Sequence, residues 1–572
     1  MKKLPFQYIL ILVSGISLLS ACRTDTQKAI TIVKSSTGRN GMVVSAHPLA
    51  SEIGLQILKE GGNAAEAAIA VQFALAVVYP RAGNLGGGGF MVYRNQQGTV
   101  TTLDFREKAP FAAHRDMYLD SASNIINNAS TEGLLAVGVP GTVAGLVETY
   151  AKYGSGKTWS SLVEPAIELA KNGFRLSKAE AGRLNQYRED FAKLNPPDMP
   201  FLSKTPWKEG DLLIQKKLAA TLSAIAEKGR DGFYAGSNAE ALLSLSSEQH
   251  GLLTEKDIEA YQAVWRVPLT THWRGYEIHS MGLPSSGGIV MGQILGMIES
   301  NLSDSLGYRN LSNVHLIVEA ERRAYMDRAN CLGDSDFYPV NVDSLLKKEY
   351  LLKKFSDFDP SKATSNVSFK KDNNNVNNEH FETTHISIVD KNGNAASVTT
   401  TLNGNFGSKV WVPGGGYFLN NEMDDFSVKP GTPNQFGLIG GEANAIAPGK
   451  RMLSSMTPTI VERGGNLWMV LGTPGGSTII TSVLQVFLNV AAFGMNIDDA
   501  VQAKRFHHQW LPDEIIVEKE AFPVDLEEQL KTMGYTLNPV DYIGMVEAIL
   551  VDADGTIHGA ADSRGDDHAA GW

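Results

Sequence analysis

Hydrophobic and polar residues alternate most clearly at the start of the last third of the chain. Apolar Ile386 and Ile388 alternate with polar His385 and Ser387, and a second β-rich run follows over residues 395–402. Alternation with a period of two is typical of a strand with two different faces, and a turn signal lies between the two runs. The pattern therefore predicts a β-hairpin.

The turn decides which residues of this hairpin face each other. If the Lys-Asn-Gly sequence between the runs forms a three-residue loop, Asp390 faces Asn394. Carried back to the start of the strand, this register places Thr401 opposite Thr383. A two-residue Asn-Gly turn would place Leu402 there instead, so two registers remain open.

Similar patterns predict the other elements. Proline in the first turn of residues 48–59 and Asn63 before residues 64–78 are typical of helix starts. Most of residues 131–355 is predicted to be helical scaffold. The remaining predicted strands cover residues 41–46, 89–94, 99–105, 457–462 and 467–471, and the remaining helices cover 141–153, 159–172, 218–228, 239–249, 287–299, 311–329 and 478–492.

A polar, Asn- and Lys-rich segment, residues 356–381, leads into the hairpin. If the chain were cut directly before Thr383, that residue would carry a free α-amino group beside its own hydroxyl. A terminal amine with a reference pKa of about 8 is a suitable base for a threonine nucleophile. The alternative is an ordinary surface loop that leads to an ordinary strand.

Composition narrows the functional classes. The chain has 572 residues, 43% hydrophobic and 20% charged, with a formal charge of −11 and a pI near 5.6. This is the composition of a large globular protein. The acidic balance argues against binding to nucleic acid and against electrostatic adhesion to anionic lipid.

The first residues indicate export. Lys2 and Lys3 precede a short apolar stretch, residues 9–19, and then the sequence Leu-Ser-Ala-Cys22. Residues 1–21 are therefore predicted to be a signal peptide. The ending resembles a bacterial lipobox, in which Cys22 is lipidated and anchors the protein to the membrane of the cell envelope. The alternative is a plain signal peptide with a chance cysteine. Because Cys331 is the other cysteine, a lipidated chain has no intramolecular disulfide.

Two further positions suggest anion binding. Arg106 follows a predicted strand, where its guanidinium can hold a carboxylate with two parallel hydrogen bonds or form a salt bridge to Asp104 or Glu107. Gly475 and Gly476 precede a predicted helix, where their amides can bind an anion or a developing oxyanion, although tight turns of this kind are also structural.

An acidic run, Glu422, Asp424 and Asp425, follows another strand end. Three carboxylates in four residues can bind calcium, a cationic ligand or only water. Adjacent hydroxyls at Ser454 and Ser455 are typical turn formers.

Five motifs give the chain a family resemblance. ETTHISIVDKNGNAASVTTTLNGNFG, then FLNNEMDDFS, KRMLSSMTPTI and LGTPGGS, with LDFREKAP upstream, resemble the γ-glutamyltransferase (glutathione hydrolase) family of N-terminal nucleophile hydrolases. The likeness runs from about residue 41 to residue 572. It implies an α+β fold, a four-layer αββα sandwich, made as one proenzyme. Autocatalytic cleavage between Glu382 and Thr383 would give a large subunit, 22–382, and a small catalytic subunit, 383–572.

The resemblance also assigns roles. Thr383 would be the nucleophile, Thr401 its hydrogen-bond partner, and Gly475 and Gly476 the oxyanion hole. The residues expected to bind the glutamyl end are Arg106, Asn403, Glu422, Asp425, Ser454 and Ser455. Residues 429–441 resemble the family's lid loop, with Phe436 where many bacterial relatives carry tyrosine. Phenylalanine lacks the hydroxyl of tyrosine, so how tightly this lid is held closed is left open. Neither a metal nor another cofactor is implied.

The expected activity is cleavage of the γ-glutamyl amide of glutathione and related compounds through a γ-glutamyl-threonyl ester, with water, an amino acid or a peptide as acceptor. Two alternatives remain. One is an acylase of the same fold that acts on glutaryl or poly-γ-glutamyl groups. The other is an uncleaved surface lipoprotein that only binds a ligand.

Overall fold

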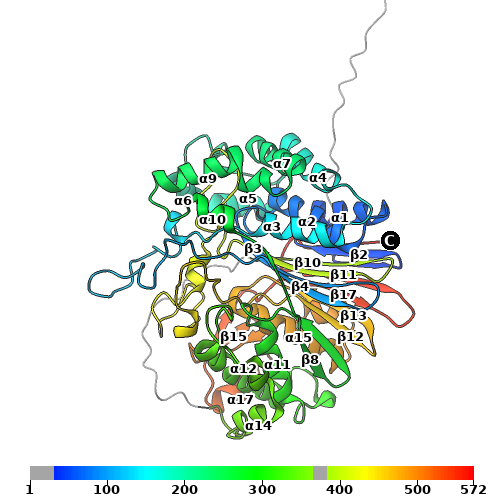
Figure 1. The fold of residues 1–572 in the computed structure, drawn as a ribbon. Coiled ribbons are helices and arrows are strands. Elements are labelled where there is room, and N and C mark those ends of the chain that lie inside the picture. The colour runs from blue at the N-terminus through cyan, green and yellow to red at the C-terminus, as the bar shows by residue number, and fades with distance from the viewer. Residues whose placement is uncertain (1–30, 365–382) are drawn as a thin grey trace, which may run out of the picture. The chain divides into compact units, whose positions relative to one another are not determined.

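Two antiparallel seven-stranded sheets stack on each other in the computed structural model, which describes residues 31–364 and 383–572 (Figure 1). The β10 sheet has the order β19 (His568–Gly571), β2 (Gly41–Ser45), β10 (Thr383–Asp390), β11 (Ala395–Thr401), β3 (Gly88–Arg94), β4 (Val100–Asp104), β7 (Val264–Arg266). The β13 sheet has the order β1 (Ser35–Gly38), β18 (Ile557–Ala561), β17 (Glu547–Val551), β13 (Asn466–Gly472), β12 (Thr459–Arg463), β9 (Tyr276–Ser280), β8 (Leu269–Trp273).

Aliphatic side chains fill the space between the sheets. Met42 and Val92 of the β10 sheet pack with Ile460, Val470 and Ile549 of the β13 sheet. All five are fully buried, or nearly so, and burying a side chain of this size stabilises the fold by about 1.5–3 kcal/mol. This layer fixes the two sheets relative to each other.

Helices cover both outer faces. Against the β10 sheet lie α1 (Pro48–Lys59), α2 (Ala64–Val78) and α3 (Thr142–Tyr153), backed by α4 (Trp159–Asn172), α5 (Lys178–Gln186), α6 (Arg188–Leu194), α7 (Lys216–Lys228), α8 (Asp231–Tyr234), α9 (Gly236–Glu248) and α10 (Glu255–Ala260). The other layer contains α11 (Gly287–Ile298), α12 (Leu311–Cys331), α13 (Val342–Leu346), α14 (Lys348–Lys354), α15 (Ile479–Ala491), α16 (Ile497–Gln502) and α17 (Val524–Thr532). The predicted four-layer αββα sandwich is confirmed.

Helix α2 shows how sequence sets the packing. Every residue of this helix is buried, and its many alanines let it lie close under β10 and β11. The Asn63 side chain accepts from the backbone of Glu66, whose carboxylate accepts from the backbone N–H of Asn63 in return. This capping box satisfies donors that would otherwise be unpaired at a buried helix start.

The prediction of a mostly helical scaffold over residues 131–355 is incomplete, because β7, β8 and β9 lie within it. Strands β7 and β8 are sheet edges. Most of their residues are only half-buried, so they lack the apolar alternation of an inner strand. A small sheet of β14 (Phe506–His507), β15 (Ile515–Glu518) and β16 (Leu537–Val540) completes the β13 side, and β5 (Phe174–Arg175) pairs with β6 (Leu212–Leu213).

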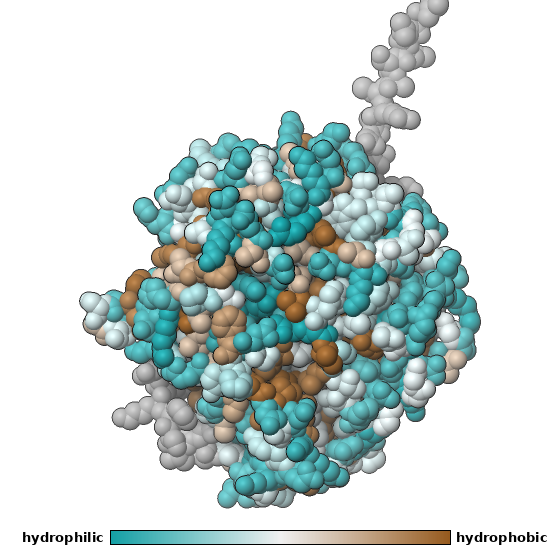
Figure 2. Space-filling model, in the orientation of Figure 1, coloured by the Kyte–Doolittle hydropathy of each residue, from teal (hydrophilic) through white to brown (hydrophobic). Residues whose placement is uncertain are grey.

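One face of the molecule is largely hydrophilic. Figure 2 shows hydrophilic residues over most of the visible face, with hydrophobic residues in separate patches. Among the described helices, none is both long enough and apolar enough to cross a bilayer. The predicted signal peptide, the lipidation site Cys22 and the cleavage residue Glu382 lie outside the described residues.

Candidate active site

The hairpin has the register predicted from its three-residue loop. Asp390 donates its backbone N–H to the carbonyl of Asn394 (3.0 Å), and Gly393 has a left-handed φ of 79°. Thr383 is the first residue of β10 and lies directly opposite Thr401 in β11. The alternative two-residue turn is therefore excluded.

The Thr383 hydroxyl is held by its neighbours across the hairpin. Its Oγ1 donates to Thr401 Oγ1 at 3.2 Å, and Thr401 Oγ1 also accepts the backbone N–H of Asn403 at 2.7 Å. All three residues are buried, and Asn403 has a left-handed φ of 77°. The hydroxyl of Thr383, at the end of a central strand, is thus held in place, because strands pair with β10 and β11 on both sides.

One small cavity brings together most of the predicted site residues. Its lining comes from strands β10 and β11, from the start of α15, from the loop at 429–441 and from other loops: Arg106, Thr383, Thr401, Asn403, Asp425, Phe436, Leu438, Ser454, Ser455, Met456, Gly476 and Ile479. Two predicted residues are not in its wall. Glu422 lies behind Arg106, and Gly475 lines the neighbouring cavity.

The Arg106 guanidinium lies between carboxylates. Its Nη1 is 2.7 Å from Glu422 Oε2 and its Nη2 is 2.5 Å from Asp425 Oδ2, whereas Glu107 Oε2 is 3.7 Å from Nη1. Asp104 accepts the backbone N–H of Arg106 (3.0 Å) and not its guanidinium. The two closest partners are thus acidic residues that the family resemblance assigns to the glutamyl end of the substrate. Glu107, one of the two salt-bridge partners considered from the sequence, is a third and more distant partner.

This cluster holds more acids than bases. Burial raises the pKa of Glu422 and of Asp425, with the Arg106 charge opposing the shift, and burial raises the pKa of Glu107 to about 8. For Arg106 itself, burial is outweighed by the surrounding carboxylates, which raise its pKa above the ordinary value. A buried group of three carboxyls around one guanidinium favours a ligand that brings a further positive charge.

Arg328 of α12 is a site residue that the sequence did not reveal. Its Nη2 donates to Ser455 Oγ and its Nε to Ser286 Oγ, both at 3.0 Å, and Ser286 Oγ donates to the Ser454 carbonyl at 2.7 Å. Burial lowers the pKa of Arg328. Ser286, directly before α11, therefore supports the Ser454-Ser455 segment together with Arg328. In the sequence, Arg328 is one charge among several on a long helix, and only its depth in the fold distinguishes it.

The loop after β13 has a backbone conformation that favours glycine at two successive positions. Gly475 and Gly476 have φ values of 142° and 56°, which side chains rarely adopt. Thr478 Oγ1 donates to the Gly475 carbonyl at 2.8 Å, and a Cβ on Gly475 would lie 2.6 Å from that hydroxyl oxygen. Helix α15 starts one short turn later, so its positive N-terminal end lies next to these amides.

The loop at 429–441 is held by the acidic run. Asp424 Oδ2 accepts the backbone N–H of Gln435 at 3.0 Å, and Asp425 Oδ1 accepts from Asn434 Nδ2 at 3.3 Å. Asp424 also accepts from Ser130, and burial raises its pKa to about 7. Hydrogen bonds to these two carboxylates hold the loop in place, although residue 436 has no hydroxyl that could do so.

The adjacent His507 and His508 are buried, and His507 is bonded within the protein to Thr481 and Gln509. Elsewhere, ligand atoms of Glu277, His279 and Glu462 lie close enough to share a metal ion. However, Glu462 already forms a 2.6 Å ion pair with Arg94, which balances its charge.

Known structures place this architecture in a class. Cephalosporin acylase from Bacillus halodurans superimposes with a TM-score of 0.81 at 24% identity, covering 96% of this chain and 99% of that one. The γ-glutamyltranspeptidase of Helicobacter pylori superimposes with a TM-score of 0.56 at 42% identity, covering 61% of this chain and 98% of that one. Stacked sheets with a threonine at the head of a central strand define the fold of the N-terminal nucleophile hydrolases.

Sequence comparison gives the family. The model of the gamma-glutamyltranspeptidase family matches residues 50–572. The glutathione hydrolase proenzyme of Escherichia coli K12 is 44% identical over 93% of this chain and 92% of its own length, and that of Bacillus subtilis 168 is 37% identical over 93% and 92%. The chain belongs to the γ-glutamyltranspeptidase family, and it is an enzyme.

Proposed function

We propose that this enzyme is an autoprocessed γ-glutamyl hydrolase and transferase whose donor is glutathione or a related γ-glutamyl compound. The main support is one cavity that is lined by both Thr383, the buried first residue of β10, and Arg106. The guanidinium of Arg106 lies between two carboxylates. The names of the relatives, glutathione hydrolase proenzymes, support the donor.

Processing comes first. The Thr383 hydroxyl oxygen attacks the carbonyl carbon of Glu382, the peptide bond between them breaks, and water then hydrolyses the resulting ester. The products are a large subunit, 22–382, and a small one, 383–572. The Thr383 nitrogen, until then part of a peptide bond, becomes a free amine that can act as a base at neutral pH.

Catalysis then uses the same hydroxyl. Thr383 Oγ1 attacks the γ-carbonyl carbon of the donor, its own amine takes the proton and passes it to the leaving nitrogen, and the amide bond breaks. The carbonyl oxygen carries negative charge in the transition state, which the amides of Gly475 and Gly476 stabilise. Water or an amine acceptor then cleaves the γ-glutamyl ester and returns the proton to Thr383.

The glutamyl end would be held by opposite charges. Its ammonium would be held by Asp425 in the cavity wall and by the nearby acidic Glu422 behind Arg106. Its carboxylate would face Arg106 and the hydroxyls of Ser454 and Ser455. Asn403, at the rim of the same cavity, positions the chain between them. These acids distinguish the proposal from an acylase of glutaryl groups, because a glutaryl group has no ammonium and would leave the acidic cluster unbalanced.

Export and anchoring are part of the proposal. The signal sequence at 1–21 and the cysteine at position 22 support a lipoprotein of the bacterial cell envelope, attached to a membrane through lipidated Cys22. Growth with a radiolabelled fatty acid tests this point. We expect label on the wild type and none on a Cys22→Ala variant.

The test of the main proposal is incubation of the purified protein, followed by separation of its fragments and N-terminal sequencing. We expect a small fragment that begins Thr-Thr-His-Ile, and release of glutamate from glutathione by the cut enzyme. A chain that stays intact after long incubation would contradict the proposal and favour a ligand-binding lipoprotein. A correctly cut enzyme that hydrolyses glutaryl amides but not γ-glutamyl amides would favour the acylase.

A further inference from the structure

A cavity separate from the active site, the α7 cavity, lies in the helical layer that covers the β10 sheet. Its volume is about 300 Å³, at the lower end of the range of small-molecule sites, and it shares no lining residue with the active-site cavity. One wall is the start of α7, which belongs to the outer helices in Figure 1. Another wall contains Trp411 and Gly416, from a loop of the proposed small subunit. A ligand here would therefore contact both products of the proposed processing.

The start of α7 gives this cavity its positive charge. Lys216 and Lys217 are the first two residues of the helix, and both line the cavity. No side chain caps the helix, and the backbone N–H groups of these two lysines have no hydrogen-bond acceptor in the described part of the chain. Lys216 is exposed and has no ion-pair partner among the described residues. Unpaired amides at a helix start, next to two ammonium groups, favour an anion, and a phosphate group above all.

The rest of the wall is mainly apolar. Pro200 and Ile214 line it, and Ile214 is 38% exposed. Trp411 is only 1% exposed, its Nε1–H has no hydrogen-bond partner in the described structure, and the Lys217 Nζ lies 5.1 Å from the centre of its ring. A buried indole N–H usually has a partner, so this wall contains an unsatisfied donor.

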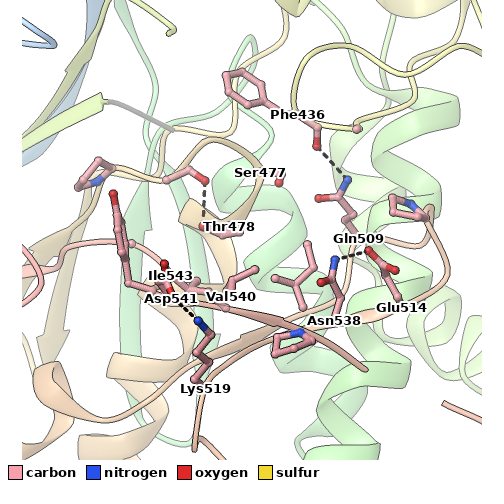
Figure 3. A pocket seen from close by; sticks show the side chains of 18 of the residues that line it. Phe436, Ser477, Thr478, Gln509, Glu514, Lys519, Asn538, Val540, Asp541 and Ile543 are labelled. Carbon is pink, nitrogen blue, oxygen red and sulfur yellow. Dashed lines mark hydrogen bonds and ion pairs between the residues drawn. The ribbon is translucent and has the colours of Figure 1, made fainter. Parts of the chain in front are cut away.

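The charge of the α7 cavity differs from that of the cavity next to the active site, which Figure 3 shows. There Lys519 is 2.6 Å from Asp541, and with Glu514 the acids outnumber the one lysine. In the α7 cavity the acidic residue of the wall is Asp198, whose Oδ2 is 3.2 Å from Lys217 Nζ. Two lysines against one carboxylate leave a local excess of positive charge in a chain of formal charge −11.

We propose that the α7 cavity binds a soluble phosphate monoester with an apolar body. The phosphate lies against the first turn of α7, between Lys216 and Lys217, and the apolar body lies against Pro200 and Ile214. The acidic balance of the whole chain argues against the surface of an anionic membrane as the source of the phosphate. The inference does not rest on the proposed γ-glutamyl transfer, and no bond is made or broken at this site.

The test is isothermal titration calorimetry of the processed enzyme, with phenyl phosphate as the probe. We expect binding at one site. Inorganic phosphate lacks the apolar body and benzyl alcohol lacks the charge, so each should bind at least about tenfold more weakly. Because the probe contacts the folded protein, it should also raise the melting temperature.

Variants should change the affinity in opposite directions. Lys216→Ala and Lys217→Ala should each weaken the binding of phenyl phosphate by about twofold to fivefold, the size expected for exposed charge pairs. Asp198→Asn should strengthen it by about twofold, because this variant removes the carboxylate that competes for Lys217. Lys228→Ala is the matched control and should keep the wild-type affinity, because Lys228 is an exposed lysine in the last turn of α7 that does not line the cavity.

Melting temperatures measured without the probe report whether the variants fold. An affinity that is the same in the wild type and in the variants of Asp198, Lys216 and Lys217 would place the probe at another site and overturn the assignment. A wild type that does not bind phenyl phosphate would overturn it as well. If that wild type bound vesicles containing phosphatidic acid, the cavity would be assigned to a membrane contact instead.

Discussion

The two halves of the active site stabilise their proposed ligand groups in opposite ways. The half around Arg106 contains ionisable groups, with the carboxyls of Glu107, Glu422 and Asp425 within 4 Å of one buried guanidinium. The half around Thr383 is neutral, and its contacts are hydroxyls and backbone amides. No charged side chain is among the hydrogen-bond partners described for Thr383.

This difference has a chemical meaning. A glutamyl end keeps its ammonium and carboxylate throughout the reaction, so fixed charges bind the ground state and the transition state alike. The carbonyl oxygen becomes charged only in the transition state, and a neutral amide stabilises that charge without holding the substrate too tightly. The charged half should therefore govern KM and the neutral half kcat.

The strongest test of the neutral half is Thr383→Ala. Both self-cleavage and turnover need this hydroxyl, so the chain should stay uncut and its activity should fall by roughly 10⁴-fold or more. Gel analysis and glutamate release measure both effects. Thr384→Val is the matched control, since Thr384 is the next residue of β10 and its hydroxyl has no hydrogen-bond partner in the described structure. A cut and active Thr383→Ala chain would exclude Thr383 as nucleophile.

Gly475→Ala tests the loop after β13, whose Gly475 and Gly476 form the proposed oxyanion hole. The new Cβ would lie 2.6 Å from Thr478 Oγ1 and would disturb the amides, so kcat should fall by roughly 10²-fold to 10³-fold with little change in KM. Steady-state kinetics on a γ-glutamyl anilide give both constants. Gly494→Ala is the control, because Gly494 also has a positive φ of 68° but no atom near its Cβ position. A rise in KM alone would contradict the division between the halves.

Arg106→Lys tests the charged half. Lysine keeps the charge but loses the planar fork that reaches Glu422 and Asp425 together, so KM should rise by roughly 10²-fold while kcat changes by less than about tenfold. Arg94→Lys breaks a comparable buried ion pair with Glu462 outside the site and should lower stability without raising KM. Equal losses of kcat in both variants would mean that Arg106 only supports the fold.

Arg328→Met tests the support of the serine turn. Ser455 would lose its 3.0 Å donor, so KM for a γ-glutamyl donor should rise by roughly fivefold to tenfold. The same variant should lose much less with a γ-aminobutyryl donor, which lacks the α-carboxylate. An equal loss with both donors would show that Arg328 has only a structural effect.

The smallest effect concerns the pH dependence of stability. The pKa of Glu107 is about 8 in the fold against an ordinary value of 4.5, so the folded protein keeps a proton that the unfolded chain has already released. Its contribution to stability is therefore present at low pH, declines from about pH 4.5 to about pH 8, and then stays constant. Glu107→Gln should flatten this part of the profile of melting temperature against pH. An unchanged profile would place Glu107 in a solvated environment.

The sequence predicted the neutral half well because its signals are local. The turn sequence narrowed the hairpin register to two possibilities, one of which the structure has, and a glycine pair before a helix marked Gly475 and Gly476 as a candidate anion site. The charged half depends on long-range contacts. Arg106 and Asp425 are far apart in sequence, and Arg328 reaches Ser455 from a helix of the outer layer. No periodicity indicates such a contact, so Arg328 was missed, and of the three ion-pair partners of Arg106 only the most distant, Glu107, was considered from the residues alone.

The order of strands determines whether the two products of processing could separate and reassemble. A cut before β10 would leave the hairpin β10–β11 of one product between β2 and β3 of the other, while β12 and β9 would join the products in the second sheet. Because strands of both chains alternate within each sheet, dilution could not separate the chains unless both unfolded. Once unfolded, however, they would have to meet again in solution, so that recovery would depend on concentration. Processing would thus make the enzyme's assembly a one-way event.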